Sequence, residues 1–158
     1  MKRLGTVLFA LALGAGLSGA AAAEEMKAPA KKPAAKSGWK VWAAPDVKFS
    51  DVEGMKGAQV APLWGDMKTG AYGLLFKWAP GFDAGWHTHS HLLRDVVVQG
   101  TFTLETESSG GVKELGPGSY IDNPAKSRHR SGCKAGGAAC VFLVTQNAAF
   151  DLIPDEKK

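Results

Sequence analysis

The sequence after residue 38 lacks any long stretch of helical periodicity. No apolar pattern with the helical repeat continues there for more than about three turns, so helix can only be a minor component. Instead, apolar residues alternate with polar ones, and Gly, Pro and Asn recur at short intervals. The sequence therefore predicts an all-β domain of about eight to ten strands in a sandwich or barrel.

Three segments indicate strands most clearly. The first carries four large apolar side chains at alternate positions: Tyr72, Leu74, Phe76 and Trp78. The second places Phe102 and Leu104 on one face and polar side chains on the other. The third, VFLVTQ at residues 141–146, is almost continuously apolar, which is typical of a central strand.

An excess of either charge is also missing from this domain. The whole chain has a formal net charge of +4, but Lys2 and Arg3 contribute +2 of it and residues 24–38 contribute another +2. The remainder has thirteen Lys and Arg residues and thirteen Asp and Glu residues. The composition therefore gives no electrostatic reason to expect binding to nucleic acid.

The N-terminus has no apolar run long enough for a membrane span. The strongly apolar stretch at residues 4–17 is shorter than the ~20 residues that a span needs. It follows two basic residues and precedes small residues ending at Ala23, an order typical of a secretory signal peptide. Residues 24–38 contain Lys, Ala and Pro but no aromatic residue, which indicates a disordered linker. We therefore expect a signal peptide at 1–23, a linker at 24–38 and one domain at 39–158, which is periplasmic or secreted and makes no membrane contact after cleavage.

The chain has two cysteines, Cys133 and Cys140, on either side of a Gly- and Ala-rich segment. In an exported protein the first expectation is a disulfide that closes this loop. Two buried free thiols are an alternative. A pair of metal ligands is disfavoured, because six intervening residues is not a usual ligand spacing.

Three of the four histidines, His87, His89 and His91, occupy alternate positions. Side chains at i, i+2 and i+4 of a strand share a face, so His87 and His89 project together, joined by His91 if the strand continues. Such a pair of imidazoles suits Zn, Cu, Fe or Ni. The fourth histidine, His129, follows a turn marked by Pro and could reach the pair from a neighbouring strand. A solvated polar face of an edge strand is the alternative for an isolated pair.

The segment from Gly81 to Gly100 resembles the first sequence motif of the cupin family, G-x5-H-x-H-x3,4-E-x6-G. Gly81, His87, His89 and Gly100 match this pattern. Counting back from Gly100 places the metal-binding Glu of the family at Leu93, whose apolar side chain cannot bind a metal. The site that the resemblance implies therefore lacks its usual carboxylate.

Residues 118–133 resemble the second cupin motif, G-x5-P-x-G-x2-H-x3-N. Gly118, Pro124 and His129 match, whereas Lys126 stands at the motif glycine and Cys133 at the motif asparagine. Together the two motifs imply an all-β, RmlC-like jelly-roll barrel, the cupin fold.

A longer resemblance extends over residues 63–151 and includes the segments PLWGD, HTH, VVVQGTF, LGPGSY and VFLVTQ. In this order they look like exported single-domain cupins of uncharacterised function, related in pattern to ChrR-like cupins and three-histidine cupin dioxygenases. This resemblance implies a metal site and gives no substrate.

The site that follows from the resemblance is one divalent transition metal held by His87, His89 and His129. Fe, Zn, Ni, Cu and Mn are not distinguished, with Fe favoured for an enzyme. His91 and Asp95 are candidates for an additional ligand, Asp95 because it shares the face of Leu93 unless a bulge intervenes. The side chains expected to line the pocket are Trp86, Leu93, Phe76, Trp78, Phe102 and Leu104. Because a ligating histidine must be neutral, metal occupancy should fall as the pH drops through about 6.

Three functions remain open at this stage. The first is an Fe(II) dioxygenase-like enzyme acting on a small anionic substrate, since three neutral ligands leave the metal with its full charge. The second is a non-catalytic metal-binding or metal-sensing module. The third is a cupin that binds a sugar or another small ligand without metal. No catalytic side chain is identified, and a homodimer stays open as the assembly.

Overall fold

The computed structural model of the protein describes residues 38–155. The predicted signal peptide and all but the last residue of the predicted linker lie outside the described residues. A compact unit begins at Lys40. Among residues 38–155, no helix has the length and apolar character required to cross a membrane.

The described residues form eleven strands and one short 3₁₀ turn, η1. Their bounds are η1 Ala44–Asp46, β1 Ser50–Asp51, β2 Ala58–Gly65, β3 Tyr72–Trp78, β4 Asp83–Thr88, β5 Leu93–Gln99, β6 Phe102–Thr106, β7 Lys113–Leu115, β8 Tyr120–Asn123, β9 His129–Cys133, β10 Cys140–Gln146 and β11 Ile153–Pro154. The all-β prediction is confirmed. The number of strands exceeds the expected eight to ten, because β1 and β11 have two residues each and carry no recognisable alternation.

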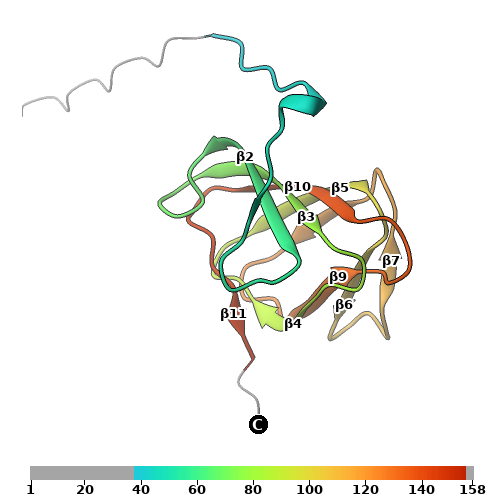
Figure 1. The fold of residues 1–158 in the computed structure, drawn as a ribbon. Coiled ribbons are helices and arrows are strands. Elements are labelled where there is room, and N and C mark those ends of the chain that lie inside the picture. Colours follow the sequence, from blue (N-terminus) through green and yellow to red (C-terminus); the bar gives the residue numbers. More distant parts are fainter. Residues whose placement is uncertain (1–37, 156–158) are drawn as a thin grey trace, which may run out of the picture. The chain divides into compact units, whose positions relative to one another are not determined.

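The strands form two antiparallel sheets, which face each other (Figure 1). The first sheet has the order β1-β2-β3-β10-β5-β8, and the second has the order β11-β4-β9-β6-β7. Strand β10 pairs with β3 on one side and β5 on the other, as its apolar run predicts. The inner faces of β3, β10 and β5 therefore form one wall of the interior.

Alternation along these strands determines which side chains enter the core. Tyr72, Leu74, Phe76 and Trp78 are all buried, as their spacing predicts. Phe102 is also buried, and its ring lies 5.5 Å from that of Trp78. These rings fill the space between the two sheets.

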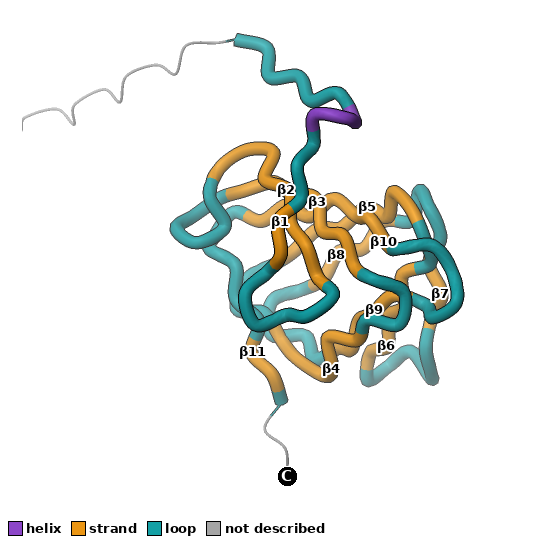
Figure 2. Tube along the Cα trace, in the orientation of Figure 1, coloured by secondary structure: helices purple, strands orange, loops and turns teal. Residues whose placement is uncertain are grey.

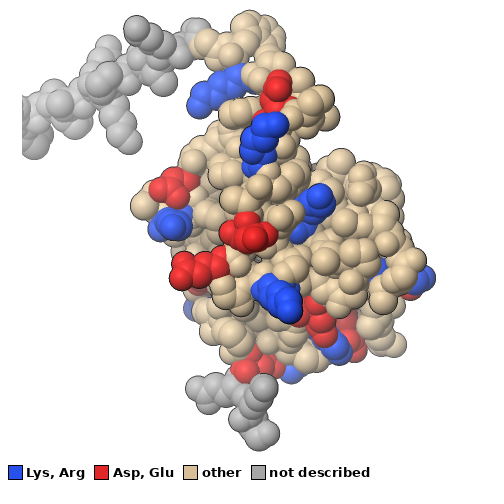
Figure 3. Space-filling view, in the orientation of Figure 1, with Lys and Arg blue, Asp and Glu red and all other residues tan. Residues whose placement is uncertain are grey.

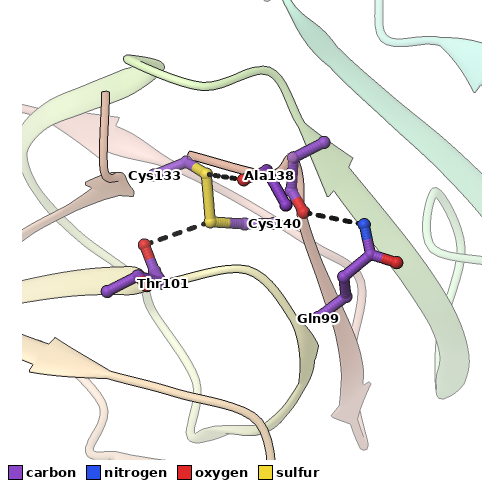
Figure 4. The surroundings of a disulfide bond; sticks show 6 residues. Gln99, Thr101, Cys133, Ala138 and Cys140 are labelled. Atoms are coloured by element: carbon purple, nitrogen blue, oxygen red, sulfur yellow. Dashed lines mark hydrogen bonds between the residues drawn. A yellow bond between two sulfur atoms is a disulfide. The ribbon is translucent and has the colours of Figure 1, made fainter. Parts of the chain in front are cut away.

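Cys133 and Cys140 form a disulfide that joins β9 of the second sheet to β10 of the first (Figure 4). Their exposed fractions are 3% and 0%, so the bond lies inside the protein. The sulfur of Cys140 is 3.2 Å from the carbonyl oxygen of Thr101. We call this part of the interior, with Trp78 and Phe142 packed edge to face 4.6 Å apart, the disulfide end.

Gly100 turns the chain between β5 and β6, at the end of the first motif. Its φ of 80° is one that residues with a side chain rarely adopt. A Cβ atom at this position would also lie 2.7 Å from the carbonyl oxygen of Ala139. The motif glycine is therefore required by both backbone conformation and space.

Charged side chains lie on the outside of the unit. On the face drawn in Figure 3, basic and acidic residues are interspersed over the described part of the chain. Several of them pair across strands, as Arg130 does with Asp83 and Lys134 with Glu114. These pairs are partly exposed and contribute little to stability.

Candidate metal centre

The structure brings His87, His89 and His129 together. His87 lies near the end of β4, His89 follows that strand, and His129 begins β9. In the antiparallel pairing of β4 with β9, His87 stands directly opposite His129. One ring nitrogen from each histidine lies within 4.8 Å of the others, and all three side chains are buried. Among the described residues, this is a group that could hold a metal ion.

Backbone carbonyls determine which nitrogen of each ring is free to bind a metal. Nδ1 of His87 lies 2.8 Å from the carbonyl oxygen of Gly85, and Nδ1 of His129 lies 2.9 Å from that of Ser127. Nδ1 of His89 is close to the carbonyl oxygen of Asp151. A carbonyl oxygen can only accept a hydrogen bond, so each Nδ1 carries the proton and each Nε2 keeps its lone pair. The three rings are thus held as metal-ligating histidines usually are.

The carbonyl that orients His87 comes from a bulge in β4. The register between β4 and β9 shifts between Asp83 and Trp86, and Gly85 has a φ of 71°. The side chain of Asp83 accepts a hydrogen bond from the Gly85 N–H at 2.9 Å, which supports the bulge. Bulges re-aim backbone groups in this way beside functional sites.

Lys126 takes over the backbone role of the motif glycine. Its φ of 61° makes it the only non-glycine residue with positive φ in the described part of the chain. Its N–H donates a hydrogen bond to the carbonyl oxygen of His89 at 2.7 Å. The loop that leads to His129 therefore keeps a glycine-like turn, despite the substitution.

The C-terminal strap, residues 150–155, crosses the site and was not predicted from the sequence. Strand β11 lies beside β4 (Figure 2), and in the pairing of these strands Pro154 stands opposite His87. Asp151 contributes the carbonyl that orients His89, and its carboxylate accepts a hydrogen bond from the N–H of Ser90 at 2.9 Å. Asp155 forms a salt bridge with Arg128, which precedes His129. The strap thus supports the three histidines from outside.

Burial keeps the histidines neutral. It lowers the pKa of His87 to about 4, aided by the neighbouring His129 and His89. Burial also lowers the pKa of His89 and that of His129. Burial thus favours the neutral form of all three rings, so a metal held by them should be lost at a lower pH than the sequence suggested.

A cavity of about 30 Å³, enough for about two water molecules, adjoins the histidines. Its walls include His87 and His89, the predicted pocket residues Phe76, Trp78 and Leu93, and a further nine side chains: Met55, Ala84, Asp95, Asn123, Ser131, Phe142, Val144, Phe150 and Leu152. Leu93 is buried where the motif places Glu, so β5 offers no carboxylate there. We call the part of the interior around His87, His89 and His129 the histidine end.

Three of the predicted pocket residues are not among the walls of this cavity. Trp86 neighbours His87 in β4 and therefore points away from it, and its ring stacks on the guanidinium of Arg128 at 4.1 Å. Phe102 packs at the disulfide end, and Leu104 is half-buried beside the core.

The two candidates for an additional ligand lie outside the three-histidine group. His91 is exposed, because β4 ends at Thr88 and the alternation does not continue to it. Asp95 is buried and lines the cavity, on the same face of β5 as Leu93.

Asn123 is a site residue that the sequence analysis missed. It stands opposite Leu93 in the pairing of β5 with β8, and its side-chain amide donates a hydrogen bond to Nε2 of His129 at 3.1 Å. The alternation of Ile121 and Asn123 in β8 was the available signal. This bond agrees with a lone pair on that nitrogen, and the amide of Asn123 must turn away before the same lone pair can bind a metal.

The family described as Domain of unknown function (DUF4437) matches residues 19–153. No curated protein matches the chain. Among solved structures, the polyketide cyclase RemF from Streptomyces resistomycificus is similar with a TM-score of 0.64 and 23% identity, over 76% of this chain and 87% of that chain. An RmlC-like cupin from Shewanella frigidimarina NCIMB 400 has a TM-score of 0.54 and 19% identity, over 70% of this chain and 93% of that chain.

The complex of SigE with the anti-sigma ChrR from Rhodobacter sphaeroides contains a chain with a TM-score of 0.51 and 23% identity, over 66% of this chain and 51% of that chain. At these identities the likeness concerns the fold alone. The protein has the cupin fold, and it belongs to the family of Domain of unknown function (DUF4437).

Proposed function

We propose that this protein binds one divalent transition metal through Nε2 of His87, His89 and His129 and acts on a small anionic substrate there. The observation that carries the proposal is the shared arrangement of the three rings. Each Nδ1 donates to a backbone carbonyl, and the ligand atoms converge within 4.8 Å. A cluster of solvated histidines has no need for such orientation.

The residues fit a transition metal. Neutral imidazoles suit Fe, Zn, Ni, Cu and Mn to different degrees, and the site alone does not select among them. Three protein ligands leave coordination positions open, and Fe(II) with open positions supplies the chemistry of dioxygenases. Fe(II) is therefore the metal we assign to an oxygenase activity.

The preference for an anion follows from the charges around the site. With Leu93 at the position of the motif Glu, the three neutral ligands leave the charge of the metal uncompensated. Phe76 and Trp78 make much of the cavity wall apolar, and a low local dielectric strengthens the attraction between a metal and an anion. We expect β-diketone-like or hydroxy-acid-like anions to bind, with their metal-chelating oxygens in the cavity.

Export is part of the proposal. The predicted signal peptide is its first support, and the disulfide between Cys133 and Cys140 is its second, because such bonds persist in oxidising compartments. We place the mature protein in the periplasm or outside the cell.

The small cavity favours one alternative, a metal-binding module without turnover. A volume of about 30 Å³ admits water but no substrate of several atoms unless the walls move. Such a module would bind metal with the same histidines and consume no oxygen.

The test is metal analysis of the mature protein, residues 24–158, purified without a His-tag. We expect about one metal ion per chain in the parent and a strong loss in His129→Ala. His91→Ala is the matched control, because His91 is exposed and outside the group, and it should keep its metal. Equal metal content in the parent and His129→Ala would contradict the proposed site.

Oxygen uptake then separates the enzyme from the module. The Fe(II)-loaded parent should consume oxygen when a β-diketone or hydroxy acid is added, and His129→Ala should not. Metal binding without oxygen uptake for any of these anions would favour the non-catalytic module.

A further inference from the structure

Asp95 is a buried acid that none of the roles above uses. It lies in β5, one inward-facing position deeper than Leu93, and its side chain lines the cavity beside the histidines. Its exposed fraction is 6%, and its Oδ1 atom has no hydrogen-bond partner. A buried polar atom without a partner is costly, and in native proteins it usually has an explanation in function or in a bound molecule.

A second unpartnered atom points to the same cavity. Trp78 Nε1 is the other buried side-chain polar atom without a partner in the described part of the chain, and Trp78 also lines the cavity. Two of the residues that line this small cavity thus each carry an unsatisfied polar atom, which favours a cavity that receives a molecule with polar atoms.

The surroundings of Asp95 favour its neutral form. In the two strands that flank β5, its partners are Val144 in β10 and Ile121 in β8. Burial alone raises the pKa of Asp95 to about 7. Within residues 38–155, no salt bridge involves Asp95.

The titratable groups that face the interior near Asp95 come from three strands and the residue after β4. They are Tyr72 in β3, His87 in β4, His89 just after it and His129 in β9. Burial, with smaller contributions from Asp95 and Asp151, raises the pKa of Tyr72, which remains a neutral phenol. Two nearby charged residues, Arg94 in β5 and Asp122 in β8, each follow an inward-facing residue in the chain. They form a salt bridge with each other on the outside of the sheet.

We infer that Asp95 is a neutral carboxylic acid that donates a hydrogen bond to the anion bound at the three-histidine centre. The inference rests on the proposed function and adds a ligand-recognising residue to it. A protonated carboxyl offers one O–H donor, and an anion held by the metal offers an acceptor oxygen or nitrogen. Ionisation of Asp95 would replace this attraction by repulsion between two negative charges. Asp95 therefore makes the site selective for anions below the pH at which it ionises.

The experiment uses Co²⁺ as a spectroscopic metal and azide as the anion. The parent, Asp95→Asn and Asp95→Leu are loaded with Co²⁺, and azide is titrated at a series of pH values from about 5 to about 8, because the bound cation lowers the pKa of Asp95 below its value in the metal-free protein. Visible absorption of the metal reports azide binding. Asn cannot ionise but keeps a donor, whereas Leu has neither property.

In the parent, azide affinity should fall by about tenfold or more as Asp95 ionises within this pH range, because a nearby carboxylate then opposes the anion. Asp95→Asn should show a clearly smaller fall, which measures any contribution from metal-bound water. Asp95→Leu should bind azide more weakly than the parent at the low end of this range, and all three proteins should take up the same amount of Co²⁺.

Infrared spectra provide a readout that needs no metal. At about pH 6, the metal-free parent should show the C=O stretch of a protonated carboxylic acid, and Asp95→Asn should lack it. Absence of this band from the parent overturns the inference, as does the same pH dependence of azide affinity in the parent and Asp95→Asn. Loss of Co²⁺ from Asp95→Asn would make Asp95 a metal ligand instead, which also overturns it. If the parent takes up no Co²⁺, the proposed function fails, and the inference fails with it.

Discussion

The two ends of the interior are held together by different means. At the disulfide end, a covalent bond joins β9 to β10, and the rings of Trp78, Phe102 and Phe142 pack against one another. At the histidine end, buried imidazoles are oriented by single hydrogen bonds to backbone carbonyls, one of them from the C-terminal strap. The first end contributes stability without chemistry, whereas the second buries groups that become useful when they hold a ligand.

In this fold, the groups that stabilise the interior and the groups that can bind a ligand lie at different ends. Apolar rings are stable in a dry interior, but neutral imidazoles and an unpartnered carboxyl lose interactions with water when they are buried. The disulfide end should therefore tolerate changes of pH, and the histidine end should respond to them.

The largest expected effect is the response of the metal-free protein to acid. The folded pKa of His87 is about 4, below the ordinary value of 6.5, so the unfolded chain binds more protons between these values. The contribution of neutral His87 to the free energy of unfolding is thus fully present above pH 6.5. As the pH falls towards 4, the free energy of unfolding should drop by roughly 3 kcal/mol, because protonation favours the unfolded chain.

Urea unfolding of the metal-free parent and His87→Gln at several pH values measures this cost as a difference. The contribution of Asp95 has the opposite pH dependence, because its raised pKa stabilises the folded state at low pH. This contribution is present in both proteins and cancels in the difference. Parallel pH profiles of the two proteins would contradict the neutral, buried state of His87.

The next largest effect concerns the disulfide end. Reduction of Cys133–Cys140 should lower the free energy of unfolding by about 2 kcal/mol, the lower part of the usual range because the loop is short. Metal affinity should change little, since the bond lies at the other end. Thiol titration and urea unfolding with and without reductant measure the loss of stability. A metal titration of the reduced protein measures the metal affinity. A large loss of metal affinity on reduction would show that the two ends are coupled.

A smaller effect, of opposite sign, is expected in the loop that precedes His129. The positive φ of Lys126 costs roughly 1–2 kcal/mol, which glycine does not pay. Lys126→Gly should therefore stabilise the protein, by about 1 kcal/mol after the greater freedom of glycine in the unfolded chain is counted. Lys126→Ala keeps the strain and is the control. If both variants have the stability of the parent, Lys126 is not strained.

The sequence predicted the features that depend on local periodicity and on the family motifs. The all-β fold and the inward face of β3 followed from alternation, and the central position of β10 followed from its continuous apolar run. It could not predict the C-terminal strap, because a two-residue strand has no period and the carbonyl of Asp151 carries no side-chain signal. Trp86 was placed in the pocket although its neighbour His87 already occupied the inward face, so the same alternation argued against it. Asn123 required knowledge of which strand pairs with β5.

The most direct test of the three-histidine site is X-ray absorption spectroscopy of the zinc-loaded protein. The spectrum counts imidazole ligands and distinguishes nitrogen from sulfur, with Zn–N distances of about 2.0–2.1 Å expected. We expect three imidazoles and no sulfur, because one ring nitrogen of each of the three histidines lies within 4.8 Å of the others and both cysteines are in the disulfide. Two or fewer imidazoles at the metal, or any sulfur ligand, would contradict it.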